Sequence, residues 1–117
     1  MLYSIFTDSI LHNIDLIEKI KFFLKKQYPI IDFVIFTDDV GYGCNNSSVL
    51  TTFYMIAYKG VVIFLNIDDY FMYKDNISGG AILYLTKEDI PNIDQNSIKN
   101  CGILTETNNE LEWIKQL

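Results

Sequence analysis

Apolar and polar positions alternate along this chain in blocks that predict strands separated by helices. Short apolar runs at Leu2–Phe6, Asp32–Phe36, Val61–Leu65, Ala81–Leu85 and Gly102–Leu104 are typical of strands. The run Val61–Leu65 contains no polar residue, which suits a central strand covered on both faces. We therefore expect Val62, Phe64 and Ile35 to be almost fully buried in the middle of the sheet.

The segments between the strands predict three helices. The first spans Ser9–Gln27 and ends before Pro29, the second spans Ser48–Tyr58 and ends at Gly60, and the third runs from Thr107 towards Leu117. In the first helix, spacings of three and four give an inner face of Ile10, Ile14, Ile17, Ile20 and Leu24. Thr107 and Glu110 have capping-box spacing. Thr86–Asp89 resembles a helix start that Pro91 cuts short, and 38–48 and 66–80 are expected to be loops.

Strands that alternate with helices predict right-handed βαβ units. The expected fold is one α/β domain over residues 1–117, with three layers and a mostly parallel, Rossmann-like sheet of about five strands. A chain of 117 residues suits one domain, and no composition shift marks a boundary within it.

Composition narrows the function classes. The net charge is −6 and all nine basic residues are lysines, which argues against direct binding of nucleic acid, usually held by clustered Arg and Lys. The absence of Arg, with abundant Ile, Asn, Lys and Tyr, fits an AT-rich genome such as that of a phage or a low-GC bacterium. The N-terminus has no basic region or cleavage site of a secretory signal, and the longest apolar stretch is too short to span a bilayer. We expect a soluble, cytoplasmic protein with no membrane association.

Acidic residues follow the predicted strands. Asp8 follows the first, Asp38 and Asp39 the second, Asp68 and Asp69 the third, and Glu106 the fifth. The carboxyl ends of parallel strands share one edge, where open α/β folds bind ligands. Carboxylates gathered there could hold Mg²⁺. The simpler interpretation, which we favour, is that these residues cap the helices that follow.

Three further groups are candidates for chemistry. The loop Gly41–Ser48 contains Gly41, Gly43, Asn45 and Asn46 before a helix and faintly resembles an anion cradle, although a plain connecting loop explains it better. His12, the only histidine, lacks the partners of a catalytic triad and is expected at the surface. Cys44 and Cys101 are expected to be free thiols at opposite ends of the sheet.

Aromatic residues cluster in the segment after the third strand. Tyr70, Phe71 and Tyr73 either form a contact surface for a protein or sugar, or fold back and become buried. The two alternatives stay open at this point.

The order of segments also resembles known enzymes. The stretch FVIFTDD, an Asn/Ser loop, a helix, VVIFLN and LYLTKED, together Asp32–Asp89, is similar to the N-terminal half of phage DNA glucosyltransferases of the GT-B type. That resemblance implies a half-domain without the donor site, with no ordinary transferase activity and no catalytic residue to carry over. Asp38-Asp39 and Asn66-Ile67-Asp68-Asp69 also resemble the start of GT-A transferases, but Asn66 stands where their metal motif has Asp.

The sequence thus predicts a small acidic binding or regulatory protein, without a cofactor, whose partner is a basic protein. Its expected binding surface comprises Asp8, Asp38, Asp39, Gly41, Gly43, Asn45, Asn46, Asp68, Asp69, Tyr70, Phe71 and Tyr73. The alternative is an Mg²⁺-dependent enzyme that acts on phosphate esters or nucleotide-sugars through the carboxylates at the strand ends.

Overall fold

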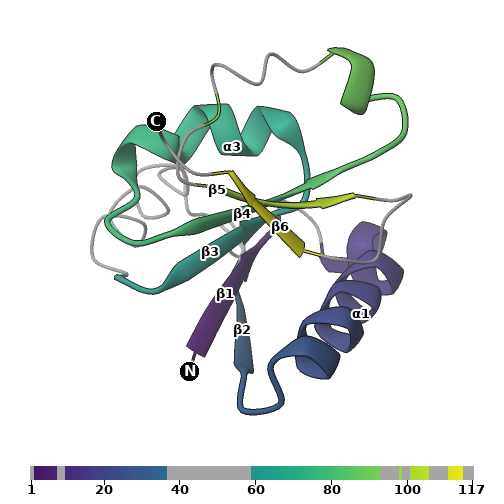
Figure 1. The fold of residues 1–117 in the computed structure, drawn as a ribbon, viewed down its shortest axis with the longest axis vertical. Coiled ribbons are helices and arrows are strands. Elements are labelled where there is room, and N and C mark those ends of the chain that lie inside the picture. The colour runs from purple at the N-terminus through teal and green to yellow at the C-terminus, as the bar shows by residue number, and fades with distance from the viewer. Residues whose placement is uncertain are drawn as a thin grey trace, which may run out of the picture.

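The computed structural model describes residues 2–7, 10–36, 59–92, 98, 101–105 and 111–114. A six-stranded sheet has the order β2-β1-β3-β4-β5-β6 (Figure 1). The strands are β1 (Leu2–Phe6), β2 (Asp32–Phe36), β3 (Val61–Phe64), β4 (Ala81–Leu85), β5 (Cys101–Thr105) and β6 (Leu111–Ile114). The first five pair in parallel and β6 pairs antiparallel to β5. The mostly parallel α/β fold is confirmed.

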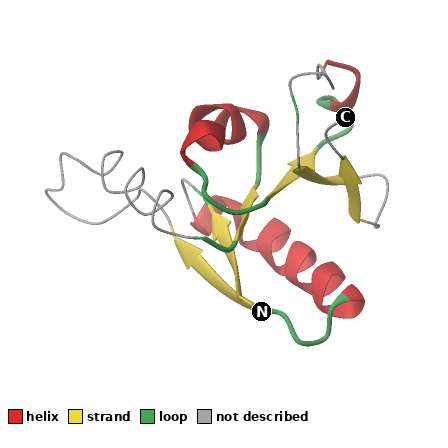
Figure 2. Ribbon diagram, turned by 60° about the vertical axis from the view of Figure 1, so that its left-hand side comes forward, coloured by secondary structure: helices red, strands yellow, loops and turns green. Residues whose placement is uncertain are grey.

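Helices cover the two faces of the sheet. The helix α1 (Ile10–Gln27) lies on one face and α3 (Ile67–Tyr73) on the other, so the chain forms three layers (Figure 2). Two short 3₁₀ turns, η1 (Lys74–Asn76) and η2 (Ile90–Asn92), follow α3 and β4. Pro91 lies inside η2, which agrees with a helix start that ends early after β4.

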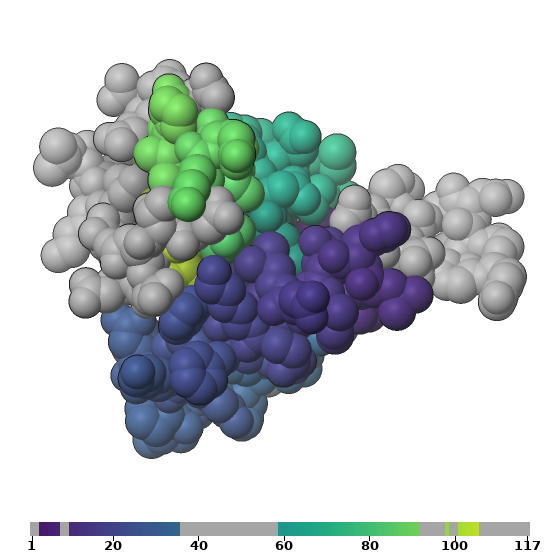
Figure 3. All heavy atoms as spheres, turned by 90° about the vertical axis from the view of Figure 1, so that its right-hand side faces the viewer, coloured from purple at the N-terminus to yellow at the C-terminus, as the bar shows by residue number. Residues whose placement is uncertain are grey.

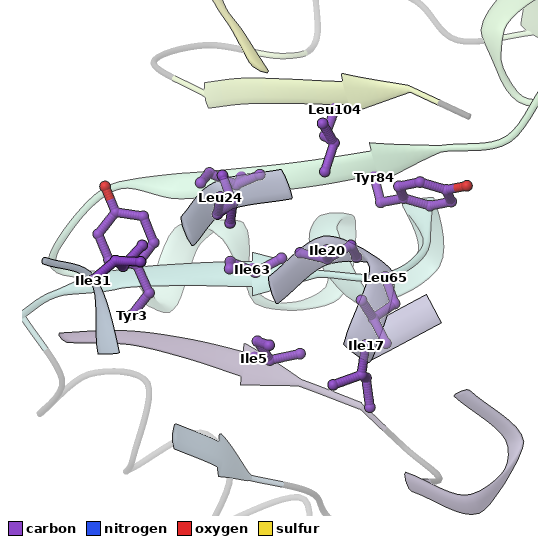
Figure 4. Close-up of a cluster of buried hydrophobic side chains, with 11 residues drawn as sticks. Tyr3, Ile5, Ile17, Ile20, Leu24, Ile31, Ile63, Leu65, Tyr84 and Leu104 are labelled. Atoms are coloured by element: carbon purple, nitrogen blue, oxygen red, sulfur yellow. The ribbon is translucent and has the colours of Figure 1, made fainter. Parts of the chain in front are cut away.

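The face under α1 is a continuous apolar cluster. Ile17, Ile20 and Leu24 project from the helix onto the sheet and are fully buried (Figure 4). Each such side chain stabilises the fold by about 1.5–3 kcal/mol. The first turns of the predicted inner face are different, because Ile10 and Ile14 are 37% and 43% exposed. The prediction that these two residues are core is wrong, since the buried stripe begins only at Ile17.

The face under α3 is rich in aromatic rings. Phe6 packs edge-on against Phe64 and Tyr73, with ring centroids 6.1 and 5.3 Å apart. Val62 and Phe64 are both fully buried, which confirms β3 as a central strand. Ile35 is only partly buried, contrary to expectation, because β2 lies at the edge of the sheet rather than near its middle.

Two other predictions of local structure are wrong. The segment after β3 is a helix and a 3₁₀ turn rather than a loop, because Asn66 caps it and its aromatic residues bury against the sheet. The segment Leu111–Ile114 is a strand rather than part of a helix. Without β6, one side of β5 would have unbonded backbone N–H and C=O groups. The pairing of β6 with β5 therefore outweighs the capping-box spacing of Thr107 and Glu110, which favours a helix. The predicted helix Ser48–Tyr58 lies outside the described residues.

Candidate functional site

The strand order places a topological switch point between β1 and β3. The chain passes from β1 to its neighbour on one side and then returns to add β3 on the other side. The register Phe6↔Phe64 brings the carboxyl ends of these two strands together. In open α/β sheets, ligands bind at such a point. The segments that follow β1 and β3 therefore form the centre of the candidate site.

The first segment begins with Thr7, which is 1% exposed. The amide nitrogen of Asn13 donates a hydrogen bond of 2.9 Å to the Thr7 hydroxyl. This bond ties the end of β1 to the second turn of α1.

The second segment begins with Asn66, the N-cap of α3. Its side-chain oxygen accepts a 2.8 Å bond from the backbone N–H of Asp69, and its amide nitrogen donates a 3.0 Å bond to the Asp69 carboxylate. Asn66 therefore caps α3 and also holds the Asp69 carboxylate, through its side-chain amide rather than its backbone N–H. Asp68 lies in the first turn of the same helix and is exposed. A carboxylate there is favoured by the helix dipole.

The segment after β4 contains a reciprocal capping box. The backbone N–H of Thr86 donates to the Asp89 carboxylate at 3.1 Å, and the N–H of Asp89 donates to the Thr86 hydroxyl at 3.3 Å. Lys87 and Glu88 between them are exposed. Polar residues after β3 and β4 therefore cap the turns that follow, and the N-cap of α3 is Asn66 rather than Asp68 or Asp69.

The acidic candidates do not gather into a cluster where the structure describes them. Within the described ranges, no group of three or more His, Cys, Asp and Glu side chains is close enough to share a metal ion. Asp8, Asp38, Asp39, Gly41, Gly43, Asn45, Asn46, Cys44 and Glu106 lie outside the described residues. Asp68, Asp69, Glu88 and Asp89 nevertheless leave the carboxyl edge of β3 and β4 acidic, with Lys87 as the basic residue among them.

The aromatic candidates contribute to the core. Tyr70 and Tyr73 are each 3% exposed, and Tyr70 packs edge-on against Phe64 at 5.9 Å. Phe71 is half-buried, and the Lys74 ammonium lies 5.0 Å from the centre of its ring. Of the two alternatives for this cluster, a contact surface or burial against the sheet, both tyrosines follow the second. Their rings are covered by the chain's own side chains and present no anchor to a partner.

The described nucleophilic candidates, His12 and Cys101, have no catalytic arrangement of described residues around them. His12 is exposed on α1, as expected. Cys101 is a free thiol and fully buried, and its Sγ donates to the Gly102 carbonyl at 3.3 Å. Burial raises the pKa of the Cys101 thiol to about 12, so the reactive thiolate is suppressed at neutral pH. Cys101 is therefore structural.

One buried hydroxyl has no hydrogen-bond partner. Ser4, at the centre of β1, is fully buried between Val34 and Val62, and its Oγ makes no hydrogen bond. An unpaired buried hydroxyl costs free energy.

The sequence patterns missed two polar features of the site. Asn13 lies between apolar positions of α1, and only its place one turn after a strand end hints at a role there. Asn66, three residues before Asp69, has the spacing of an Asx capping box, a signal that the aromatic cluster obscured.

Comparisons with known proteins give no relative. No protein-family model matches the chain, and no curated protein or solved structure matches it either. Among the described helices, none combines the length and apolar character needed to cross a membrane.

Proposed function

We propose that this protein is a small binding or regulatory protein whose carboxyl sheet edge recognises a basic protein partner. The observation that carries the proposal is the exposed, acidic edge formed after β3 and β4, next to the switch point. The Asp69 carboxylate accepts a bond from the Asn66 side chain and the Asp89 carboxylate accepts one from the Thr86 backbone N–H, so each carboxylate has a local partner rather than converging on a reacting group. An acidic edge would attract a basic partner and speed their encounter at low salt.

The proposal also concerns the source of the protein and the cellular compartment in which it acts. The order of segments over residues 32–89 resembles a glucosyltransferase half-domain. This resemblance supports a phage-encoded, glycosyltransferase-like protein, and the protein itself has no complete catalytic motif. The free, buried Cys101 thiol is compatible with the reducing conditions of the cytoplasm. No direct contact with nucleic acid or membrane is part of the proposal.

Charge reversal at the edge tests the proposal. Proteins captured on the immobilised chain from an extract of its native host would be identified, and the affinity of each purified candidate would then be measured. Asp68→Lys should weaken binding at least tenfold, because it inverts an exposed charge at the edge. Asp75→Lys makes the same change at an exposed residue of η1, after the C-terminal end of α3, and should leave affinity unchanged. Equal effects of the two variants would contradict the proposal.

Asp68 is preferable to its neighbours for this test. The Asp69 carboxylate bonds the N-cap Asn66 and Tyr70 is buried, so substitutions at either residue change stability as well as charge or shape. Asp68 is exposed, so its substitution mainly changes the charge of the edge.

The second candidate is an Mg²⁺-dependent enzyme acting on phosphate esters or nucleotide-sugars. It is supported by the adjacency of the β1 and β3 carboxyl ends, since β1 leads directly to Asp8 and β3 to Asp68. Calorimetric titration with Mg²⁺ or Mn²⁺ separates the candidates. Binding that disappears in Asp39→Asn or Asp68→Asn would favour the enzyme, and no heat at millimolar metal would remove it.

A further inference from the structure

An open groove lies on the opposite flank of the fold from the aromatic core. It has a volume of about 660 Å³ and runs between α1 and the edge strand β2. Its lining consists of Glu18, Lys21, Phe22, Lys25, Asp32 and Phe33. Figure 3 shows the face of the molecule on which α1 and the segment after it, coloured purple to blue, reach the surface.

Within its own five residues, the strand beside the groove has little of the usual protection of an edge. In the described sheet β2 is the terminal strand, with β1 on one side and no described strand on the other (Figure 1). Phe33, Val34 and Ile35 are all only partly buried. Edge strands are normally blunted by Lys, Pro or a bulge, and β2 has only Asp32 at its beginning. Its backbone is therefore suited to pairing with another strand.

The helix beside the groove exposes apolar surface on the same flank. At 3.6 residues per turn, Glu18, Lys21, Phe22 and Lys25 form one stripe along α1. Phe22 is 65% exposed in the middle of that stripe. An exposed aromatic ring beside an open strand edge is a feature of an interaction surface.

The charges of the stripe are complementary to those of a second copy of the stripe that runs antiparallel to it. Glu18 lies at one end and Lys25 two turns later at the other. When two copies of the stripe run antiparallel across a two-fold axis near Phe22, Glu18 of each copy faces Lys25 of the other. Lys21 is already held by its own Glu18 at 3.7 Å, which limits repulsion near the axis. Closed dimers use such self-complementary patches.

The centre of β2 and the centre of the α1 stripe lie at similar distances from the turn that connects the two elements. A turn closed by the hydrogen bond from the Ile31 N–H to the Tyr28 carbonyl connects α1 to β2. Phe22 lies about 9 Å before this turn at the helical rise. Val34, the middle residue of β2, lies about 10 Å after it at the strand rise. One two-fold axis can therefore pass through the centre of both elements.

We propose that two copies of this chain associate across β2 and the α1 stripe, with antiparallel β2 strands that continue the sheet through both copies. The groove balances two carboxylates with two ammonium groups, whereas the whole chain has a net charge of −6. Two acidic molecules meet with least repulsion at such a neutral patch. This self-association is independent of the proposed binding surface at the carboxyl edge.

Sedimentation velocity over a range of protein concentrations tests this proposal. The native chain should show a concentration-dependent dimer. Phe22→Ser and Lys25→Glu should each raise the dimer dissociation constant at least tenfold, and Lys26→Glu is the matched control, because Lys26 is exposed on the same turn but lies outside the groove. A native chain that is monomeric at every concentration would overturn the proposal.

A charge swap gives a second, more specific measurement. Glu18→Lys should weaken the dimer as Lys25→Glu does, and the double variant should recover most of the native dissociation constant. Circular dichroism would verify that every variant stays folded. A dimer that forms normally in Lys25→Glu, or that the swap fails to restore, uses a different surface and would also overturn the proposal.

Discussion

At the scale of single residues, Phe64 is the best test of the core. It is fully buried on a central strand and packs against the rings of Phe6 and Tyr70. Phe64→Ala should lower the free energy of unfolding by about 3–5 kcal/mol, through lost burial and the cavity left behind. Chemical denaturation measures the change. Met72→Ala is the control, because Met72 is 64% exposed and should change stability by less than about 0.5 kcal/mol. A loss below about 1 kcal/mol at Phe64 would contradict the central position of β3.

Cys101 predicts a dependence of stability on alkaline pH. Burial raises the pKa of its thiol from 9.0 to about 12. Because the folded state holds the proton more tightly, its contribution to stability is complete below pH 9.0 and is lost as the pH rises from 9.0 towards 12. The loss should reach about 1.4 kcal/mol per pH unit.

The measurement compares two chains that both carry Cys44→Ser, one of them with Cys101→Ala. The slope of unfolding free energy against pH should be steeper above pH 9.0 for the chain that retains Cys101. The comparison removes the contribution of the tyrosines, which titrate in both chains. Parallel slopes would mean that the thiol is not buried as the structure places it.

At the scale of elements, α3 depends on its N-cap. Asn66 makes two hydrogen bonds with Asp69, and α3 has only seven residues. Asn66→Ala should therefore destabilise the protein by about 1 kcal/mol. Asn76→Ala, in the 3₁₀ turn that follows, makes the same change without removing an N-cap and should cost less. Urea denaturation of both variants checks the prediction, and equal losses would show that the N-cap contributes little.

The elements also show which sequence signals were sufficient. Continuous apolar runs predicted β1, β2 and β4 at the bounds that the structure gives them, because a buried parallel strand needs apolar side chains on both faces. The helix α1 was equally clear from its spacing and from Pro29 after it. These patterns depend only on residues that are close together along the chain, so they can be recognised from the sequence alone.

Features that depend on distant partners were not predictable in this way. The segment after β3 has few strong helix formers, and α3 is stabilised by the burial of Tyr70 and Tyr73 against strands far away in sequence. The strand β6 depends on the unpaired edge of β5. In the candidate site, capping by polar residues after β3 and β4 could be inferred from residue type, whereas the burial of the tyrosines required the packed structure.

At the scale of the whole molecule, β2 and β6 are the two terminal strands of the described sheet, and they are protected to different degrees. β6 has four residues, one of them Glu112, and short or charged strands resist pairing at an edge. β2 carries a charge only at its first residue, Asp32. An unprotected edge invites pairing with another chain, and one such edge per molecule permits only a closed dimer. The position of β6 thus limits self-association as well as completing the sheet.

Removal of residues 111–117 should therefore change the mode of assembly. The truncated chain would expose the backbone of β5, whose residues Cys101–Thr105 carry no charge. With open edges at both β2 and β5, each molecule could pair on two sides, so association should continue beyond the dimer and light scattering should rise with protein concentration. Circular dichroism would first establish that the truncated chain retains its sheet. Adding Val34→Lys to the truncated chain places a charge on β2 and should return it to small oligomers. A folded truncated chain that keeps the native molar mass would show that β6 does not protect this edge.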